Sequence, residues 1–336
     1  MKVSELGEFG LIDLRAKMVY EARDKQAISW QKLVIGIGDD AAAWYCDAPV
    51  GLATTDSLLQ GVHFTLEIAT WYELGWKTLA ISLSDIAAMG GVPRYALISL
   101  GLPDSTEVED VVELYRGMIE LGRQFGIAIA GGDTDSAPVV ILNSTVFGTA
   151  GEKTQHILTR RAARAGELIA VTGYLGAAAA GLEMLKKKLA FDQKASAILR
   201  QAFLQPYPRV AEGQLLASLG VKAAIDISDG LVADLGHICQ ASKVGARIQV
   251  DLVPVHPAVK DNFGDKSLEM ALSGGEDYEL LFTASKEVID RVRSQASCLI
   301  TVIGEVVTDE MRQVALVDRQ GRPFKPARTG WQHFAP

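Results

Sequence analysis

The stretch Leu79-Ala-Ile-Ser-Leu-Ser-Asp-Ile-Ala-Ala-Met-Gly-Gly91 predicts the end of a buried helix that begins near Ala69. Gly90 and Gly91 end this helix, because glycine readily adopts the left-handed conformation that closes a last helical turn. Asp85 lies among apolar neighbours, and no face of the helix is clearly polar at that point. A carboxylate in such surroundings is costly to bury unless it is hydrogen-bonded, paired with a cation or bound to a metal. The helix alone leaves these explanations open.

The composition is that of a folded protein of two domains. The chain has 336 residues, 49% of them hydrophobic and 22% charged, and single hydrophobic cores rarely grow past roughly 250–300 residues. A net charge of −8 argues against nucleic acid as a partner, because phosphate binding needs a basic surface. We expect no membrane helix, since no apolar run approaches the length of about 20 residues that a span requires. From the first residues we also expect no export signal, and three scattered cysteines are typical of a reducing, cytoplasmic location.

Helices and short strands alternate along the whole chain, which predicts a mixed α/β (α+β) fold. We expect strands at 33–37, 51–57, 95–101, 127–130, 139–147, 168–171, 223–227, 245–252, 278–283 and 300–306. We expect helices at 5–22, 69–89, 106–125, 194–204, 209–219, 230–241 and 286–295, and an Ala-rich helix after Gly176. Thr106 and Glu109 have the spacing of a capping box, and Gly126 ends that helix. The basic segment 151–166 interrupts the apolar pattern, so we divide the chain into domains 1–150 and 151–336.

One pattern recurs in both halves: a short apolar strand ends in glycine or a hydroxyl residue and then in an acid. It occurs in Gly38-Asp-Asp40, Thr54-Thr-Asp56, Gly131-Gly-Asp133 and Asp226-Ile-Ser-Asp229. Each one singly is explained by a turn or by the start of a helix. If the acids converge with Asp85, their mutual repulsion requires metal ions, and oxygen-only ligands favour Mg²⁺ or Mn²⁺ over zinc. The phosphate-binding G-x-x-x-x-G-K-[ST] loop and the G-x-G-x-x-G motif are both absent.

Seven motifs together resemble the thiamine-monophosphate kinase family, in the same order and over the full length of the chain. They are Gly36-Ile-Gly-Asp-Asp-Ala41, Thr54-Thr-Asp-Ser-Leu58, Gly61-Val-His-Phe64, Leu83-Ser-Asp-Ile-Ala-Ala-Met-Gly90, Gly131-Gly-Asp-Thr134, Ile225-Asp-Ile-Ser-Asp-Gly-Leu231 and Ser273-Gly-Gly-Glu-Asp-Tyr-Glu-Leu280. The Gly-Asp-Asp and Gly-Gly-Asp elements are shared with a wider superfamily of ATP-using enzymes. That superfamily includes aminoimidazole-ribonucleotide synthetase and selenophosphate synthetase. One departure from the family is Asp135, which stands where a hydroxyl residue is common.

The resemblance implies a role for each residue that matches a family position. The implied magnesium ligands are Asp40, Thr54, Thr55, Asp56, Asp85, Asp133, Asp226 and Asp229. The implied ATP contacts are Tyr115, Gly132, Asp133, Arg160 and Ser228, and the implied substrate contacts are His63, Glu276 and Trp331. Three of these have plain alternatives: Tyr115 as a core residue, Arg160 as part of a solvated linker, and Trp331 as packing near a chain end. No general base is implied.

The resemblance also implies an activity and an assembly. The activity is transfer of the γ-phosphoryl group of ATP to thiamine monophosphate, which gives thiamine diphosphate in the final step of its biosynthesis, assisted by several Mg²⁺ ions. The N-terminal domain, 1–150, would bind ATP and Mg²⁺ and pair with a second copy to form a dimeric β-barrel with flanking helices. The C-terminal α/β domain, 151–336, would bind the substrate and its phosphate. The alternatives are another ATP-using member of the superfamily, such as a cyclising synthetase, and a catalytically silent binding module.

Overall fold

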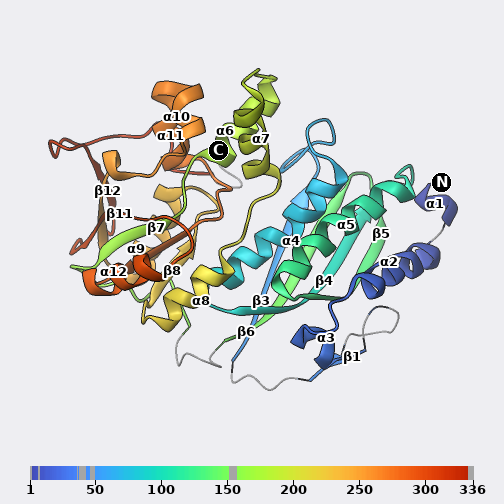
Figure 1. The fold of residues 1–336 in the computed structure, drawn as a ribbon. Helices are drawn as coiled ribbons and strands as arrows, with labels where there is room; N and C mark the ends of the chain where they lie inside the picture. The colour runs from blue at the N-terminus through green and yellow to red at the C-terminus, as the bar shows by residue number, and fades with distance from the viewer. Residues whose placement is uncertain are drawn as a thin grey trace. The chain divides into compact units, whose positions relative to one another are not determined.

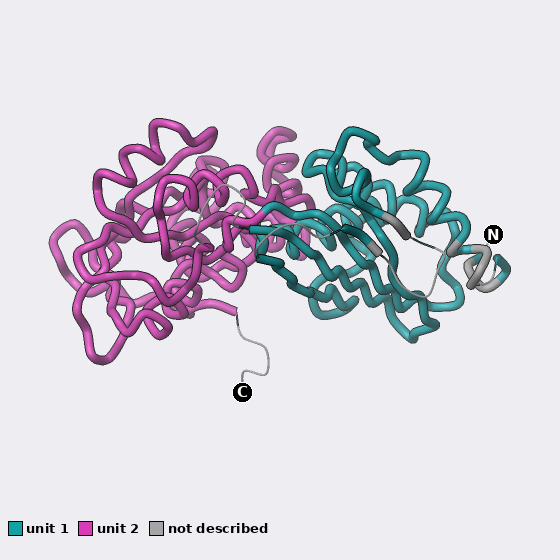
Figure 2. The backbone as a smooth tube through the Cα atoms, turned by 90° about the horizontal axis from the view of Figure 1, so that it is seen from below, with its two compact units in different colours: residues 1–86, 92–152 teal, residues 87–91, 153–336 magenta. Residues whose placement is uncertain are grey.

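A computed structural model describes residues 2–6, 8–35, 37, 43–45, 50–150 and 157–331. The chain separates into two compact units, which Figure 2 colours teal and magenta. Unit 1 consists of residues 1–86 and 92–152, and unit 2 consists of residues 87–91 and 153–336. The roles predicted for the two domains stay predictions. None of the helices in the described ranges combines the length and the apolar character that crossing a membrane requires.

Unit 1 is built on a four-stranded sheet with the strand order β3-β6-β4-β5. The first three strands pair antiparallel, and β4 and β5 pair parallel. The strands are β3 Val50–Leu59, β4 Val92–Leu102, β5 Ala128–Ser136 and β6 Ile141–Ala150. A separate antiparallel pair is formed by β1 Leu33–Ile35 and β2 Ala43–Trp44. The helices are α1 Val3–Leu6, α2 Glu8–Ala22, α3 Ile28–Lys32, α4 Trp71–Ala88 and α5 Val108–Phe125.

Helices α4 and α5 lie side by side over one face of this sheet (Figure 1). Two glycines let them approach backbone to backbone. A Cβ atom at Gly75 would lie 1.8 Å from the carbonyl oxygen of Leu114, and one at Gly117 would lie 2.0 Å from that of Tyr72. The other face of the sheet is open around Thr55 and Ser99, which are exposed. Near Tyr95 the same face is covered, because Trp44 of β2 stacks on the Tyr95 ring. The dimeric barrel requires a second copy of the chain and stays a prediction.

Unit 2 contains a six-stranded sheet with the strand order β12-β9-β11-β7-β10-β8, in which only β12 and β9 pair parallel. Its strands are β7 Leu168–Thr172, β8 Ala223–Asp226, β9 Gly245–Gln249, β10 Leu280–Ala284, β11 Ile300–Val307 and β12 Val314–Val317. Its helices are α6 Ala177–Lys187, α7 Gln193–Leu204, α8 Val210–Ser218, α9 Leu231–Ser242, α10 Pro257–Phe263, α11 Ser267–Ser273 and α12 Lys286–Gln295. The short 3₁₀ turns are η1 Val250–Leu252 and η2 Gly264–Lys266. One hydrophobic core joins the sheet to α6, α9 and α11 through residues such as Ile225, Leu281, Ala180, Leu235 and Leu272.

The mixed two-domain fold class is confirmed, and several local predictions are corrected. The capping box was wrong, because α5 begins at Val108 and the residue before it, Glu107, makes no side-chain cap. Gly126 does end α5, in the left-handed conformation with φ 65°. The strand predicted over 127–130 continues to Ser136, because its pairing with β4 runs as far as Leu102. Helices α10 and α11 and strand β12 were not predicted.

Candidate functional site

In unit 1, strand β3 and helix α4 bring three of the predicted site residues together. Asp85 is half-buried on α4, and its carboxylate accepts a hydrogen bond from the Thr54 hydroxyl on β3. Asp56 lies two residues further along β3, on the same face of the strand. Its carboxylate accepts a hydrogen bond of 2.9 Å from the Ser82 hydroxyl, one turn before Asp85.

The polar side chains continue along this side of α4. The Ser82 hydroxyl lies 2.7 Å from the Ser144 hydroxyl on β6, and Ser144 donates to the carbonyl oxygen of Thr78 at 2.6 Å. Positions 78, 82 and 85 are spaced by four and three residues, so they share one face of a helix. The prediction that α4 has no clearly polar face is therefore corrected: a buried polar stripe runs through its apolar sequence.

The carboxylates of Asp56 and Asp85 repel each other. Burial first, and then the charge of Asp85, raises the pKa of Asp56 from 3.8 to about 6, against the lowering effect of the Ser82 hydrogen bond. Two acids in this position ionise together most readily when a cation lies between them. The donors are all oxygen atoms from carboxylates and hydroxyls, which fits Mg²⁺.

Thr55 and Asp133 lie on the opposite face of the sheet. The Thr55 hydroxyl lies 3.0 Å from that of Thr145, and the Asp133 carboxylate accepts a hydrogen bond from the backbone N–H of Thr134 at 2.8 Å. Asp133 is also separated from β3 by two intervening strands, which corresponds to roughly 14 Å. Unit 1 therefore does not bring Asp133 to the Asp56 and Asp85 pair. Gly132 is explained by packing, because a Cβ atom there would lie 1.8 Å from the carbonyl oxygen of Ile98.

Two other predicted residues of unit 1, Tyr115 and His63, are hydrogen-bonded within the unit. Tyr115 is 2% exposed, and its hydroxyl accepts a hydrogen bond of 3.3 Å from Arg15, so the structure places it in the core. His63 is half-buried in the turn after β3, where its Nδ1 accepts the backbone N–H of Leu59 at 3.0 Å. Asp40 lies outside the described residues. An ATP contact by Tyr115 stays a prediction.

In unit 2, four predicted residues meet at the loop between β8 and α9. The backbone N–H of Glu276 donates to the carbonyl oxygen of Ser228 at 2.7 Å, and that of Trp331 donates to the carbonyl oxygen of Asp229 at 2.9 Å. Asp226, at the end of β8, is 4% exposed, whereas Trp331 is 54% exposed. Arg160 is exposed elsewhere in the unit, where its carbonyl oxygen accepts the Ser242 hydroxyl at 2.7 Å.

Asp234, which was not predicted from the sequence, holds this loop in place. Its carboxylate accepts the backbone N–H groups of Ser228, Asp229 and Gly230 at 3.0 to 3.1 Å. Burial and the charge of Asp229 raise the pKa of Asp234 to about 7, although the three N–H donors oppose this. Ligand atoms of Asp229, Asp234 and His237 lie within 4.8 Å of one another. The signal available in the sequence was an acid in the first turn of a helix that follows Asp-Gly.

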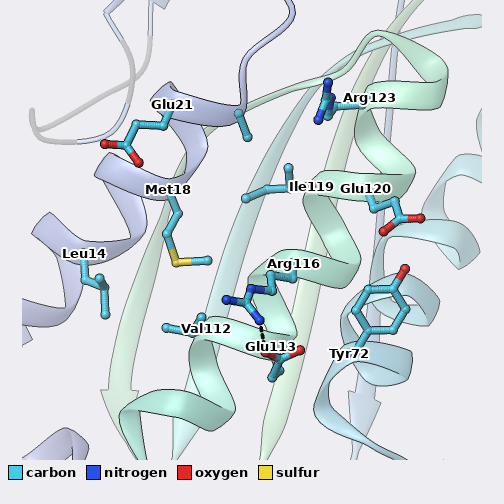
Figure 3. A pocket seen from close by; sticks show the side chains of 11 residues that line it. Leu14, Met18, Glu21, Tyr72, Val112, Glu113, Arg116, Ile119, Glu120 and Arg123 are labelled. Atoms are coloured by element: carbon cyan, nitrogen blue, oxygen red, sulfur yellow. Dashed lines mark hydrogen bonds and ion pairs between the residues drawn. The ribbon is translucent and has the colours of Figure 1, made fainter.

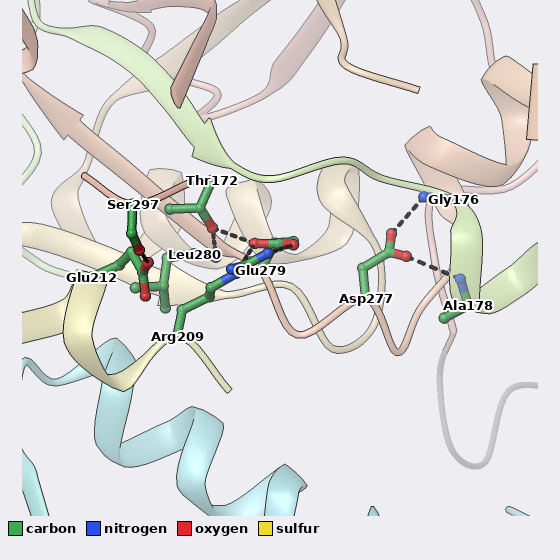
Figure 4. Close-up of polar contacts among 9 residues, drawn as sticks. All are labelled: Thr172, Gly176, Ala178, Arg209, Glu212, Asp277, Glu279, Leu280 and Ser297. Atoms are coloured by element: carbon green, nitrogen blue, oxygen red, sulfur yellow. Dashed lines mark hydrogen bonds and ion pairs between the residues drawn. The ribbon is translucent and has the colours of Figure 1, made fainter. Parts of the chain in front are cut away.

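Two further acids next to Glu276 were also missed (Figure 4). The Asp277 carboxylate accepts the backbone N–H groups of Gly176 at 2.8 Å and Ala178 at 3.3 Å, at the start of α6. Glu279 forms a two-pronged ion pair with Arg209, with both N···O distances at 2.6 Å. Thr172 donates its hydroxyl to the same carboxylate at 2.6 Å. Burial raises the pKa of Asp277 to about 8, against the effect of its two N–H donors.

A groove in unit 1 lies apart from the predicted residues. It has a volume of about 710 Å³ and runs between α2 and α5, beside Tyr72 at the start of α4 (Figure 3). Leu14, Met18 and Ile119 form its apolar part, and charged side chains such as Arg116 also line it. None of the predicted site residues lines it.

Comparison with known proteins identifies the family. The N-terminal domain of the AIR synthase related proteins matches residues 38–150, and their C-terminal domain matches residues 164–316. The thiamine-monophosphate kinase of Buchnera aphidicola subsp. Schizaphis graminum is 37% identical over 98% of this chain and 99% of its own length. The enzyme of Escherichia coli K12 is 36% identical over 98% of both chains. The chain belongs to the thiamine-monophosphate kinase family. It is therefore a phosphotransferase.

Solved structures of this family have the same fold. The thiamine-monophosphate kinase of Stenotrophomonas maltophilia K279a has a TM-score of 0.78 and 34% identity, and covers 91% of this chain and 94% of its own. A structure of AaThiL complexed with AMPPCP and TMP has a TM-score of 0.76 and 33% identity, and covers 99% of both chains. The hydrogenase maturation protein HypE in complex with ATP has a TM-score of 0.74 over 96% of both chains. At 17% identity, HypE shows only that the fold is shared.

Proposed function

We propose that this chain transfers the γ-phosphoryl group of ATP to the phosphate of thiamine monophosphate, giving ADP and thiamine diphosphate. The observation that carries the proposal is the pair of carboxylates formed by Asp56 and Asp85, which the fold holds together despite their like charge. Support comes from AaThiL, whose complex contains a non-hydrolysable ATP analogue together with TMP and whose sequence aligns over almost the whole chain.

In this reaction the side chains have to align the two phosphate groups and stabilise their charge, and they need not form or break a covalent bond. A phosphate oxygen of thiamine monophosphate forms a bond to the γ-phosphorus, and the bond from that phosphorus to the β–γ bridging oxygen breaks in line. The attacking oxygen is already anionic, so no side chain has to remove a proton. The electron pair of the broken bond remains on ADP.

Mg²⁺ would be held by the oxygen donors of each unit. In unit 1 these are Thr54, Asp56 and Asp85, and in unit 2 they are Asp226 and Asp229. The bound ions would neutralise the repulsion between the two phosphate groups. The proposal also includes Asp40, Thr55 and Asp133 as metal contacts, on the strength of the sequence resemblance.

The substrate contacts in this proposal are Glu276, Trp331 and His63. A carboxylate and an exposed aromatic ring suit a pyrimidine that is joined to a cationic thiazolium. Glu276 and Trp331 are both tied to the loop of Ser228 and Asp229 by their backbone N–H groups. The ATP contacts proposed are Tyr115, Gly132, Asp133, Arg160 and Ser228.

The deciding experiment incubates the purified protein with ATP, Mg²⁺ and thiamine monophosphate and measures ADP and thiamine diphosphate. Equal amounts of both products are expected, with no inorganic phosphate. Release of phosphate with other substrates of the superfamily would indicate a cyclising synthetase instead, and ATP binding without turnover would indicate a silent binding module. Light scattering tests the proposed homodimer, and fractionation of cells tests the proposed cytoplasmic location.

A further inference from the structure

The turn that carries Glu276 has an unusual backbone. Glu276 has φ 70° and Tyr278 has φ 50°, so two residues with a Cβ atom adopt the left-handed conformation within three positions. This conformation is unfavourable for such residues and persists only where surrounding contacts impose it. The contacts that impose it therefore decide where the Glu276 side chain is held.

One side of the turn is fixed by backbone hydrogen bonds to the end of β8. Glu276 donates to Ser228 at 2.7 Å, and Tyr278 donates to Ile227 at 2.9 Å. Ile227 in turn donates to the carbonyl oxygen of Glu279 at 2.8 Å. These three bonds extend the pairing of β8 and β10 into the turn. They attach both left-handed residues, Glu276 and Tyr278, to the segment that follows β8.

A side chain within the turn, Asp277, makes a further set of contacts, to the start of α6. Its two carboxylate oxygens accept N–H groups from Gly176 and Ala178, the first donors of α6 (Figure 4). Gly176 precedes α6 and has no side chain that could cap the helix itself. Asp277 thus supplies the missing cap from 99 to 101 residues away, and in return α6 anchors the centre of the turn.

We propose that Asp277 is a positioning residue that holds Glu276 in its substrate-binding orientation by anchoring the turn to the start of α6. This inference rests on the proposed function, because Glu276 is taken to contact thiamine monophosphate. With Asp277 removed, the turn loses its anchor at the start of α6, and the left-handed pair relaxes toward ordinary backbone angles. The carboxylate of Glu276 then moves away from the cationic ring of the substrate. Because the backbone bond between Glu276 and Ser228, a proposed ATP contact, does not involve the Asp277 side chain, we expect a smaller effect on ATP binding.

The test compares Asp277→Ala with a matched control, Asp192→Ala. Asp192 also caps a helix, α7, by accepting two backbone N–H groups at 3.0 Å each, and it is not among the predicted site residues. Both variants lose a capping carboxylate, so Asp192→Ala shows how far the loss of a helix cap outside the site changes the kinetics. We expect Asp277→Ala to raise the KM for thiamine monophosphate about tenfold or more. The KM for ATP is expected to change less than about twofold, and Asp192→Ala should leave both KM values unchanged within the same margin.

A double-mutant cycle shows whether Asp277 acts through Glu276. Glu276→Gln alone should raise the KM for thiamine monophosphate, and adding Asp277→Ala to it should raise that KM by less than about twofold more. Asp277→Asn keeps one acceptor oxygen for the start of α6, so it should recover part of the loss. It also serves as the second variant if Asp277→Ala does not fold.

Three results would overturn the inference: equal effects of the Asp277 and Asp192 substitutions, an equal rise in both KM values, or full additivity with Glu276→Gln. Failure of the proposed function is distinguishable from all three. In that case the unaltered protein itself makes no thiamine diphosphate.

Discussion

The substitution Asp85→Asn distinguishes two interpretations of this residue: a metal ligand, or a structural hydrogen-bond acceptor. Asparagine has nearly the same shape and keeps one oxygen that can accept the Thr54 hydroxyl. What it removes is the negative charge beside Asp56. If Asp85 is a metal ligand, its charge repels Asp56 when no metal is bound, so the substitution should stabilise the metal-free protein. If Asp85 is a structural acceptor, the substitution replaces a hydrogen bond to a charged group by a weaker one to an amide and should lower the stability.

The size of the expected change follows from the pKa of Asp56. That pKa is raised from 3.8 to about 6, first by burial and then by the charge of Asp85. Each pKa unit corresponds to about 1.4 kcal/mol, so all causes together amount to about 3 kcal/mol. Burial takes the larger share and solvent screens a half-buried pair, which leaves about 1 kcal/mol for the repulsion that Asp85→Asn relieves.

In EDTA, we therefore expect Asp85→Asn to raise Tm by about 2 °C in a calorimetric scan. Thiamine diphosphate formation with Mg²⁺ should fall by about a hundredfold or more, because a metal ligand is lost at the site of phosphoryl transfer. Asp110→Asn is the matched control, since Asp110 is a half-buried acid on α5 that is not among the predicted site residues. Its activity should stay within about twofold of the unaltered protein. A lower Tm together with retained activity in Asp85→Asn would refute the metal-ligand interpretation.

Three further predictions concern packing, metal and pH. Gly75→Ala should destabilise unit 1 by about 3 kcal/mol or prevent folding, while Gly122→Ala, whose Cβ would meet nothing closer than 3.6 Å, should be nearly neutral in urea unfolding. Mg²⁺ at a hundred times its Kd should raise the free energy of unfolding by about 2.7 kcal/mol over the EDTA value, and Asp85→Asn should lose much of this gain. Asp277 has a folded-state pKa of about 8, above its usual 3.8, so the folded state holds this proton more tightly than the unfolded state. The stability of the protein should therefore fall more between pH 5 and pH 9 than that of Asp277→Asn, as measured by urea unfolding at both pH values.

The sequence predicts best those features that depend on a few neighbouring residues. Gly90 and Gly126 were expected to end their helices, and both adopt left-handed angles, φ 69° and φ 65°. The alternation of strands and helices was likewise visible, because hydrophobic periodicity is a local property. Gly75 and Gly117, where α4 and α5 cross, could not be interpreted in this way. The backbone that each glycine contacts is more than 35 residues distant in the chain.

The acids that anchor loops in unit 2 were missed for the same physical reason. Asp277 caps a helix that begins about 100 residues earlier, and Glu279 pairs with Arg209, which lies 70 residues before it. Only the sheet order that places β10 between β7 and β8 makes these contacts possible. The motif Ser273-Gly-Gly-Glu-Asp-Tyr-Glu-Leu280 was assigned by resemblance to one contact residue, Glu276. In the structure its neighbours fix the turn on which Glu276 lies.

The run Thr54-Thr-Asp56 shows why a motif does not by itself give a site. Alternate residues of a strand point to opposite faces, so Thr54 and Asp56 face α4 while Thr55 faces the open side of the sheet. Asp133 follows the same rule, since the register places it opposite Ser99, on the open side with Thr55. Side chains from both faces cannot surround one ion, so Thr55 can join Asp56 and Asp85 only through its backbone carbonyl oxygen. If Asp133 contacts a metal ion or ATP, as the sequence predicts, it does so at the open face.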